Sequence, residues 1–210
     1  MIVELPSVVP PAGPNPAGQN TDHPMRRLTE SVAGDETSWT AATASDVERF
    51  FDDLAPGWND RVSGDPLDAI DDAFERGGPL GGRCLELGSG TGVATPRLVG
   101  RVAALVALDI SGAMLRLAPP GAAPRVQADS AHLPVRDGAA DTVVLVNTLL
   151  FASEVERVLA PGGAVVWVNT LGDHTPIHLS AAAVEAALPG AWMGVASLAA
   201  WGSWCVLRRA

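Results

Sequence analysis

The sequence contains no lysine. All 14 of its basic residues are arginines, set against 24 acidic residues and a formal net charge of −10 at pH 7. Binding to a nucleic-acid backbone needs a concentration of basic side chains that neutralises phosphates. The charge balance therefore argues against nucleic acid as the main partner. Between residues 30 and 75 acids far outnumber the two arginines, Arg49 and Arg61, and we interpret most of these acids as a solvated face.

Long apolar runs, a leader sequence and a cysteine framework are missing as well. No apolar stretch reaches the roughly 18–20 residues that span a bilayer, and residues 1–6 lack the basic start and apolar core of a signal peptide. These absences predict a cytoplasmic protein without a membrane partner. The two cysteines, Cys84 and Cys205, lie in apolar strand-like runs, which indicates buried free thiols rather than disulfides or a zinc site.

What the sequence does contain fits one globular domain of 210 residues, 47% hydrophobic and 18% charged. Residues 1–24 are rich in proline, glycine and asparagine, which predicts a disordered tail and leaves Met25 as an alternative natural start. Residues 25–81 are predicted to form an N-terminal helical cap segment, and residues 82–210 the core.

Two helices are predicted in the cap segment. Residues 45–48 form a capping box at Ser45, and an apolar stripe from Val47 to Leu54 follows at helical spacing. The second helix is predicted to start with Asp65 as its N-cap and to stop at Gly77.

Strands and helices alternate from residue 82 onward. The predicted strands are 83–87, 103–109, 124–128, 141–147, 163–169, 192–198 and 203–208, and the predicted helices lie near 95–100, 111–117, 152–160 and 180–188. This alternation predicts an α/β fold with a mostly parallel sheet and helices on both faces. The last two strands are too close for a helical crossover, so we expect the last one to run antiparallel.

The most informative motif is the glycine-rich turn after the first of these strands. Its pattern is E-x-G-x-G-x-G, with Glu86 two residues before Gly88. A dinucleotide site would use G-x-G-x-x-G, which would require glycine in place of Val93. A carboxylate beside the turn suits a cationic ligand better than a pyrophosphate. S-adenosylmethionine carries an ammonium and a sulfonium and no phosphate.

Three later strands end in polar residues that would meet at the same edge of the sheet. Asp109 lies 21 positions after Gly88, the spacing at which an acid accepts ribose hydroxyls in dinucleotide sites; its alternative role is the N-cap of the helix after Ser111. Asp129 could accept from the exocyclic amine of adenine, and Asn147 follows the fourth strand.

These stretches together resemble the successive motifs of class I S-adenosylmethionine-dependent methyltransferases, from about residue 45 to the C-terminus. The nearest subgroup is the small, single-domain type related to ubiquinone/menaquinone-biosynthesis methyltransferases. The resemblance implies a Rossmann-like, seven-stranded sheet with an antiparallel last strand, and S-adenosyl-L-methionine as cofactor. The implied cofactor-binding residues are Glu86, Gly88, Ser89 and Gly90 at the methionine end, Asp109 at the ribose, Ile110, Asp129 and Ser130 at the adenine, and Asn147 near the transferring methyl group.

The acceptor side carries a weaker signal. Residues 51–59 resemble the subgroup's N-terminal signature, with Trp58 where a tyrosine is usual. We expect Phe51 and Trp58 to bind the substrate, with core packing as the alternative. The segment from Asn147 to Glu154 is short for the family, which predicts a trimmed or remodelled acceptor pocket.

Candidate catalytic residues are Asn147 and His174. The loop after the fifth strand holds His174 and His178, and His174 is our candidate for a general base, with an ordinary polar loop as the alternative. His23 lies in the predicted tail, so we expect no role for it. No clustered carboxylates indicate a metal site.

The sequence thus predicts a methyltransferase that acts on a neutral or cationic small-molecule acceptor by in-line transfer. One alternative is a non-catalytic subunit that binds S-adenosylmethionine for regulation or as a scaffold. A less favoured alternative is an NAD-dependent oxidoreductase. The acceptor, the methylated atom and the oligomeric state are not encoded in these motifs.

Overall fold

The computed structural model describes residues 1–13, 23–62 and 66–210. Its strands form one sheet in the order β1-β7-β8-β6-β5-β2-β3-β4. The strands are β1 (Ile2–Glu4), β2 (Arg83–Leu87), β3 (Ala104–Asp109), β4 (Arg125–Gln127), β5 (Ala140–Val146), β6 (Leu159–Asn169), β7 (Trp192–Ala199) and β8 (Gly202–Arg209). The helices are α1 (Pro24–Gly34), α2 (Ala41–Leu54), α3 (Trp58–Val62), α4 (Asp68–Arg76), α5 (Thr95–Leu98), α6 (Gly112–Leu117), α7 (Ala152–Val158) and α8 (Ala181–Ala187), with short 3-10 turns η1 (Glu36–Ser38), η2 (Ala55–Gly57) and η3 (Gly172–His174).

The sheet has the predicted polarity. β8 runs antiparallel to both β6 and β7, and the remaining neighbours are parallel. From β2 the chain continues to β3 and β4, and then returns to β5 on the other side of β2. The carboxyl ends of β2 and β5 therefore form the point where the strand order reverses, which is where open α/β sheets bind ligands.

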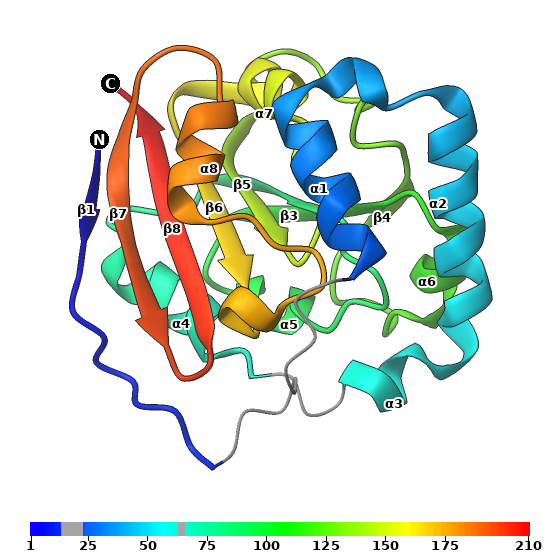
Figure 1. The fold of residues 1–210 in the computed structure, drawn as a ribbon, viewed down its shortest axis with the longest axis horizontal. Coiled ribbons are helices and arrows are strands. Elements are labelled where there is room, and N and C mark those ends of the chain that lie inside the picture. The colour runs from blue at the N-terminus through cyan, green and yellow to red at the C-terminus, as the bar shows by residue number, and fades with distance from the viewer. Residues whose placement is uncertain (14–22, 63–65) are drawn as a thin grey trace.

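Alternation along the central strands supplies two apolar faces. Leu85 and Val143 belong to the core on one face, whereas Cys84 and Val144 belong to the core on the other. In Figure 1, α1 and α8 lie on the near side of the sheet, and α4 and α5 lie behind it. Because both faces are covered, the central strands are hydrophobic almost without interruption, as buried parallel strands usually are.

The cap segment crosses the carboxyl edge of the sheet through α1, η1, α2 and α3 (Figure 1). Its Met25 and Val32 form a small apolar cluster with Leu149, Phe151 and Ile177, which lie after β5 and after η3. In contrast, α4 packs on β6, β7 and β8. The C-terminal part of the predicted cap segment 25–81 therefore belongs to the helical layer of the sheet.

Two helix starts differ from the prediction. α2 begins at Ala41, because Thr40 caps it by accepting a hydrogen bond from the Thr43 amide, so Ser45 is an interior residue. α4 begins at Asp68 after Leu67, which makes no side-chain cap bond. The predicted cap at Asp65 lies outside the described residues. The predicted stop at Gly77 is confirmed.

The predicted disordered tail is wrong for the first residues of the chain. β1 pairs in parallel with β7, with Val3 opposite Val195, and so adds an eighth strand to the expected seven. Beyond it, the Pro6 carbonyl accepts a hydrogen bond from Arg76 Nη1 at 2.9 Å. Without β1, the edge of β7 would have unpaired backbone donors and acceptors. Hydrogen bonds to these groups hold the segment in place although it buries few side chains. Part of the predicted tail, residues 14–22, lies outside the described residues.

Both cysteines are buried free thiols, as predicted, and burial raises the pKa of Cys84 and of Cys205 to about 12. No helix in the described parts of the chain combines the length and apolar character needed to cross a membrane.

Candidate functional site

The glycine-rich turn after β2 opens at the reversal point of the sheet. Gly88 and Gly90 have φ values of +65° and +54°, a region that glycine adopts without strain. A Cβ on Gly88 would lie 2.0 Å from Thr148 Oγ1, so the turn packs directly against the loop after β5. Above Gly90 the nearest atom to such a Cβ would be Trp58 Nε1, at 4.0 Å. A side chain at Gly90 would therefore narrow the space between the turn and Trp58.

Asp109 ends β3 beside this turn and is 8% exposed. Its Oδ2 accepts a hydrogen bond from the Gly90 amide and its Oδ1 accepts one from the Ser111 amide, both at 2.7 Å. Burial raises the pKa of Asp109, and these two donors oppose the rise. The N-cap of α6 is Ser111, whose hydroxyl accepts from the Met114 amide. Asp109 is thus not itself the N-cap; it braces the turn and keeps free lone pairs that face the pocket.

Asp129 follows β4 and already has protein partners. Trp39 Nε1 donates to its two carboxylate oxygens at 2.9 and 3.2 Å, and the Ala131 amide donates to Oδ1 at 2.8 Å. The Trp39 ring also meets Phe151 edge-on, with centroids 5.0 Å apart. Nothing in the sequence spacing pointed to Trp39, because it comes from the cap segment, 90 residues before its partner.

Within the described part of the chain, Asn147 and Ala200 are the non-glycine residues with positive φ, and Asn147 has a φ of +49°. Its Nδ2 donates to Thr170 Oγ1 at 2.7 Å, and its Oδ1 accepts from the Thr170 amide at 2.9 Å. Asparagine tolerates this left-handed conformation better than most residues. The bonds to the buried Thr170 hold the loop after β5 in place, and they leave Asn147 lining a pocket.

Glu86 does not reach that pocket. It is 1% exposed, and its Oε2 accepts a hydrogen bond from Thr95 Oγ1 at 2.7 Å on the face of the sheet covered by α5. Burial raises the pKa of Glu86 to about 7. Ser89 is also buried outside the pocket lining. The expected direct contacts of Glu86 and Ser89 with a methionine moiety are therefore not supported. Side chains alternate between the two faces of a strand, and the Glu86 side chain lies on the face that α5 covers.

The histidine expectations are also corrected. His174 lies in η3 outside the pocket lining, with a buried Nδ1 that has no partner among the described residues. His178 is held between Arg26 Nη1 at 3.1 Å and Asp173 Oδ1 at 3.2 Å, and burial together with the Arg26 charge lowers its pKa. His23, for which no role was expected, lines the pocket instead.

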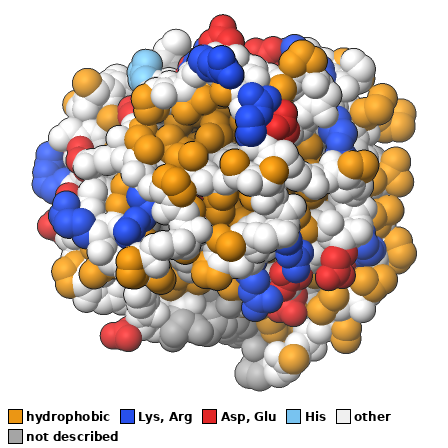
Figure 2. Space-filling view, turned by 180° about the vertical axis from the view of Figure 1, so that it is seen from behind, with side chains coloured by type: hydrophobic (Ala, Val, Ile, Leu, Met, Phe, Trp, Pro, Cys, Tyr) orange, Lys and Arg blue, Asp and Glu red, His pale blue; other side chains and the backbone are white. Residues whose placement is uncertain are grey.

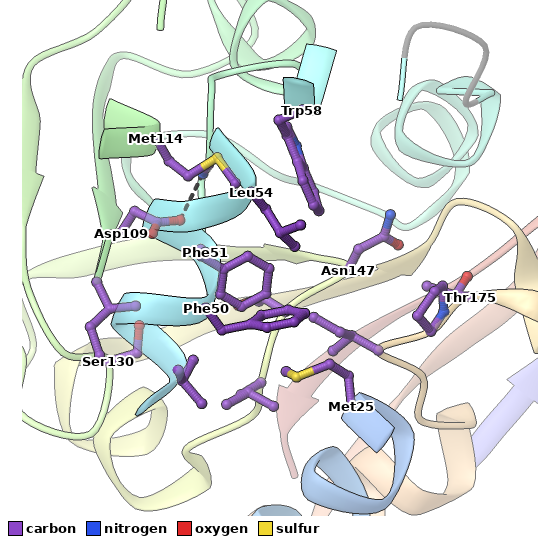
Figure 3. A pocket seen from close by; sticks show the side chains of 18 of the residues that line it. Met25, Phe50, Phe51, Leu54, Trp58, Asp109, Met114, Ser130, Asn147 and Thr175 are labelled. Carbon is purple, nitrogen blue, oxygen red and sulfur yellow. Dashed lines mark hydrogen bonds between the residues drawn. The ribbon is translucent and has the colours of Figure 1, made fainter. Parts of the chain in front are cut away.

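The pocket has a volume of about 550 Å³ and lies between the sheet edge and the cap segment. Figure 3 shows Asp109 and Ser130 on one side and Asn147 and Thr175 on the other, with the two phenylalanines of α2 between them. The lining consists of His23, Met25, Trp39, Val47, Phe50, Phe51, Leu54, Trp58, Arg61, Val62, Gly88, Gly90, Asp109, Ile110, Met114, Asp129, Ser130, Asn147, Thr148, Leu149, Phe151, Leu171, Thr175, Pro176 and Ile177. Both expected substrate-binding residues, Phe51 and Trp58, are among them, with ring centroids 5.9 Å apart.

The cap segment is tied to each loop of the sheet edge. Thr91 Oγ1 donates to Asn59 Oδ1 at 2.6 Å after β2. After β3, the Ala113 amide donates to Asp52 Oδ1 at 3.1 Å. Together with the bond from Trp39, these contacts cover the pocket with residues that precede the core in sequence. No group of three or more acidic, histidine or cysteine side chains within the described residues could hold a metal ion.

Comparison with known proteins agrees with this geometry. Residues 85–167 match the methyltransferase domain family. A biotin biosynthesis bifunctional protein from Cellvibrio japonicus is 36% identical over 48% of this chain and 22% of its own length. A demethylmenaquinone methyltransferase from Mycolicibacterium vanbaalenii is 35% identical over 40% of each chain, so the matches span well under half of both relatives.

Among solved structures, a complex of the protein DhpI with S-adenosylhomocysteine superposes with a TM-score of 0.64. The match covers 81% of this chain and 98% of that one at 21% identity, which shows a shared fold. The methyltransferase match contains the end of β2, all of β3 and β5, and the loops that bear Gly88, Asp109 and Asn147. The chain therefore carries a methyltransferase domain over residues 85–167, and it shares its fold with a solved complex of S-adenosylhomocysteine.

Proposed function

We propose that this chain transfers a methyl group from S-adenosylmethionine to a small-molecule acceptor. The observation that carries the proposal is the pocket itself. Two carboxylates, Asp109 and Asp129, lie at the ends of neighbouring strands beside a glycine turn, and the rest of the lining is mainly apolar. Carboxylates and an open turn suit a ligand with hydroxyl, amine and cationic groups, whereas a pyrophosphate would meet two negative charges.

The residues present fit the cofactor. Each Asp109 oxygen accepts one backbone N–H and keeps a lone pair for a ribose hydroxyl. Asp129 and Ser130 are proposed to bind the adenine edge, with Ile110 against its face. Gly88 and Gly90 would allow the methionine part of the cofactor to approach the backbone closely. When bound, S-adenosylmethionine supplies a methyl group on a sulfonium: the acceptor's lone pair forms the new bond, the carbon–sulfur electron pair stays on sulfur, and any acceptor proton passes to solvent.

The residues of this chain would contribute mainly positioning and exclusion of water. Phe51 and Trp58 come from the cap and meet edge-on above the glycine turn. Fixing two reactants in line in a dry site supplies several kcal/mol in favourable cases. Asn147, locked by Thr170, is proposed to orient groups near the transferring methyl. A general base is required only where the acceptor must lose a proton to react.

Other partners are less compatible with the surface. On the face seen in Figure 2, arginine side chains are interspersed with acidic and apolar ones instead of forming one basic patch. With a net charge of −10, this pattern supports a small-molecule acceptor over nucleic acid. A cytoplasmic location stays a prediction from the sequence.

Calorimetry followed by mass spectrometry tests the proposal. The protein should bind S-adenosylmethionine and S-adenosylhomocysteine but not NAD, and an acceptor screen should give a product heavier by one methylene unit. NAD binding without S-adenosylmethionine binding would contradict the proposal. Tight cofactor binding without turnover of any acceptor would favour the non-catalytic, regulatory or scaffold alternative.

A further inference from the structure

The start of α1 is bound to the loop that follows η3, beside the pocket (Figure 1). Arg26 on α1 donates from Nη2 to the carbonyl oxygens of Asp173 and Thr175, and its Nη1 contacts His178 Nδ1 at 3.1 Å. Resting on the function proposed above, we propose that Arg26 and His178 form a latch that holds the cap segment closed over the pocket, and that a proton on His178 opens this latch.

The contacts of His178 determine its protonation state. A guanidinium group has N–H donors only, so the Nδ1 atom that faces Arg26 accepts a hydrogen bond and carries no proton. The proton of the neutral ring is therefore on Nε2, which lies 3.2 Å from Asp173 Oδ1 and donates to it. The closed latch thus requires a neutral imidazole.

A second proton on this ring would go to Nδ1 and would point at Arg26. Two donors would then face each other across the 3.1 Å contact, with an imidazolium beside a guanidinium. Nη2 could keep its two carbonyl bonds only if the guanidinium stayed beside the new charge. The buried Nε of Arg26 has no hydrogen-bond partner within the described residues, so the contacts with this loop hold the guanidinium in place.

The charged groups around His178 act in opposite directions. Asp173 on η3 and Glu30 on α1 favour a proton on the ring, whereas burial and the Arg26 charge disfavour it. Both acids are exposed, so water screens their charges, while His178 itself is 9% exposed. Burial has the largest effect, and the pKa of His178 is lowered. The closed latch therefore binds a proton less readily than an open latch in which His178 meets water.

Residues on both sides of the latch line the pocket. Met25 directly precedes Arg26, and Thr175 and Ile177 belong to the loop that Arg26 binds. Figure 3 shows Met25 and Thr175 on the same side of the pocket as Asn147. Met25 and Ile177 also belong to one apolar cluster, a contact that pH does not change. Opening the latch would therefore loosen this side of the cap and release a bound cofactor more easily.

The size of the effect follows from proton linkage. A histidine in water has a pKa of about 6.5. Because the pKa of His178 is lowered in the closed latch, closure is favoured above about pH 6.5 and weakens as the pH falls below that value. At pH 5.5 the open latch would be protonated about ten to one, so the equilibrium constant for closing should be at most about tenfold lower than at pH 7.5.

Hydrogen exchange of the α1 amides tests the latch without any ligand. After correction for the intrinsic exchange rate, wild-type α1 should exchange about three- to tenfold faster at pH 5.5 than at pH 7.5. His178→Asn offers an oxygen to Arg26 but does not titrate, so its exchange should change by less than about twofold. Arg26→Met keeps an apolar stem and should exchange fast at both pH values.

His174→Asn is the matched control, because it removes the other histidine of the same loop. Its α1 exchange should keep the wild-type pH dependence. Exchange in the wild type that does not depend on pH would overturn the proposal. A pH dependence that is lost in His174→Asn and kept in His178→Asn would also overturn it.

Calorimetry with S-adenosylhomocysteine connects the latch to the pocket. Between pH 7.5 and 5.5 the affinity should fall about three- to tenfold more in the wild type than in His178→Asn, which keeps every other titrating group, including Glu86. An equal pH dependence of the two affinities would overturn the role of the latch at the pocket. Failure of the wild type to bind S-adenosylhomocysteine at pH 7.5, with the expected exchange results, would contradict the proposed function and support the latch.

Discussion

Replacing the Asp109 carboxylate by an amide tests the cofactor site most directly. In the folded protein each carboxylate oxygen accepts one backbone N–H, from Gly90 and from Ser111. Asp109→Asn keeps the size of the side chain but offers only one acceptor oxygen, and its NH₂ group then faces the second N–H donor. The substitution therefore affects both the brace of the glycine turn and the proposed ribose site.

The two effects have different magnitudes. A buried donor left without a partner costs about 1–3 kcal/mol of unfolding free energy, which lowers Tm by about 2–12 °C in a domain of this size. Charge-assisted hydrogen bonds are worth about 1.5–3 kcal/mol each and their losses are rarely additive. Loss of the ribose contacts should then weaken cofactor binding by about 2–4 kcal/mol, or about 30- to 700-fold.

Isothermal titration calorimetry with S-adenosylhomocysteine measures the second effect, and thermal unfolding measures the first. Asp46→Asn is the control, because Asp46 is an exposed acid on α2 that pairs with Arg49. It should change neither quantity. A loss of affinity below about threefold in Asp109→Asn, together with a lowered Tm, would refute the ribose role and leave Asp109 as a structural brace of the loop.

Three further predictions concern stability. Burial raises the pKa of Glu86 from 4.5 to about 7, so between these values the folded state binds more protons than the unfolded state and wild-type stability falls as the pH rises. Relative to wild type, the unfolding free energy of Glu86→Gln should therefore rise by about 3 kcal/mol from pH 4.5 to pH 8. Urea unfolding measures it, and parallel pH profiles of the two proteins would contradict the prediction. Deleting residues 1–9 removes β1 and the Pro6 carbonyl that Arg76 binds. The deletion should lower the unfolding free energy by about 2 kcal/mol and the Tm by about 4–8 °C. An unchanged Tm would show that β1 contributes nothing to stability. Gly88→Ala places a Cβ against Thr148 Oγ1, whereas a Cβ in the control Gly100→Ala, at a similar positive φ, meets open space. Thermal unfolding should therefore show Gly88→Ala to be less stable than Gly100→Ala by about 1–3 kcal/mol. Equal Tm values for the two variants would refute the clash.

Local sequence patterns were sufficient for the architecture of the core. The predicted strands from residue 83 onward are all present within a few residues, and the antiparallel last strand followed from a short connection alone. Apolar periodicity and turn residues act over a few positions, and burial on both faces of the sheet makes that periodicity strong. The same logic located Gly88, Asp109 and Asn147, since they end strands whose order the chain dictates.

Elements stabilised by distant partners were not predictable in this way. Residues 1–13 contain no strand pattern of their own, and β1 exists because β7 offers an unpaired edge, with Val3 opposite Val195. α2 starts earlier than its capping box because Thr40 is available as a cap. The β1–β7 contact exists only in the folded chain, whereas the Thr40 cap is a local contact with the Thr43 amide that competes with the capping box at Ser45.

The residues of the pocket lining also divide into those that local sequence patterns predict and those that contacts between distant segments place there. The sequence alone determined the glycine turn and the acids at the strand ends, because their spacing along the chain is also their spacing along one edge of the sheet. Only the tertiary structure brought Trp39 to Asp129 and His23 into the pocket, and placed Glu86 and His174 outside it. The orientation of a side chain at a site built from four or more segments depends on packing between those segments, and no local periodicity encodes that packing.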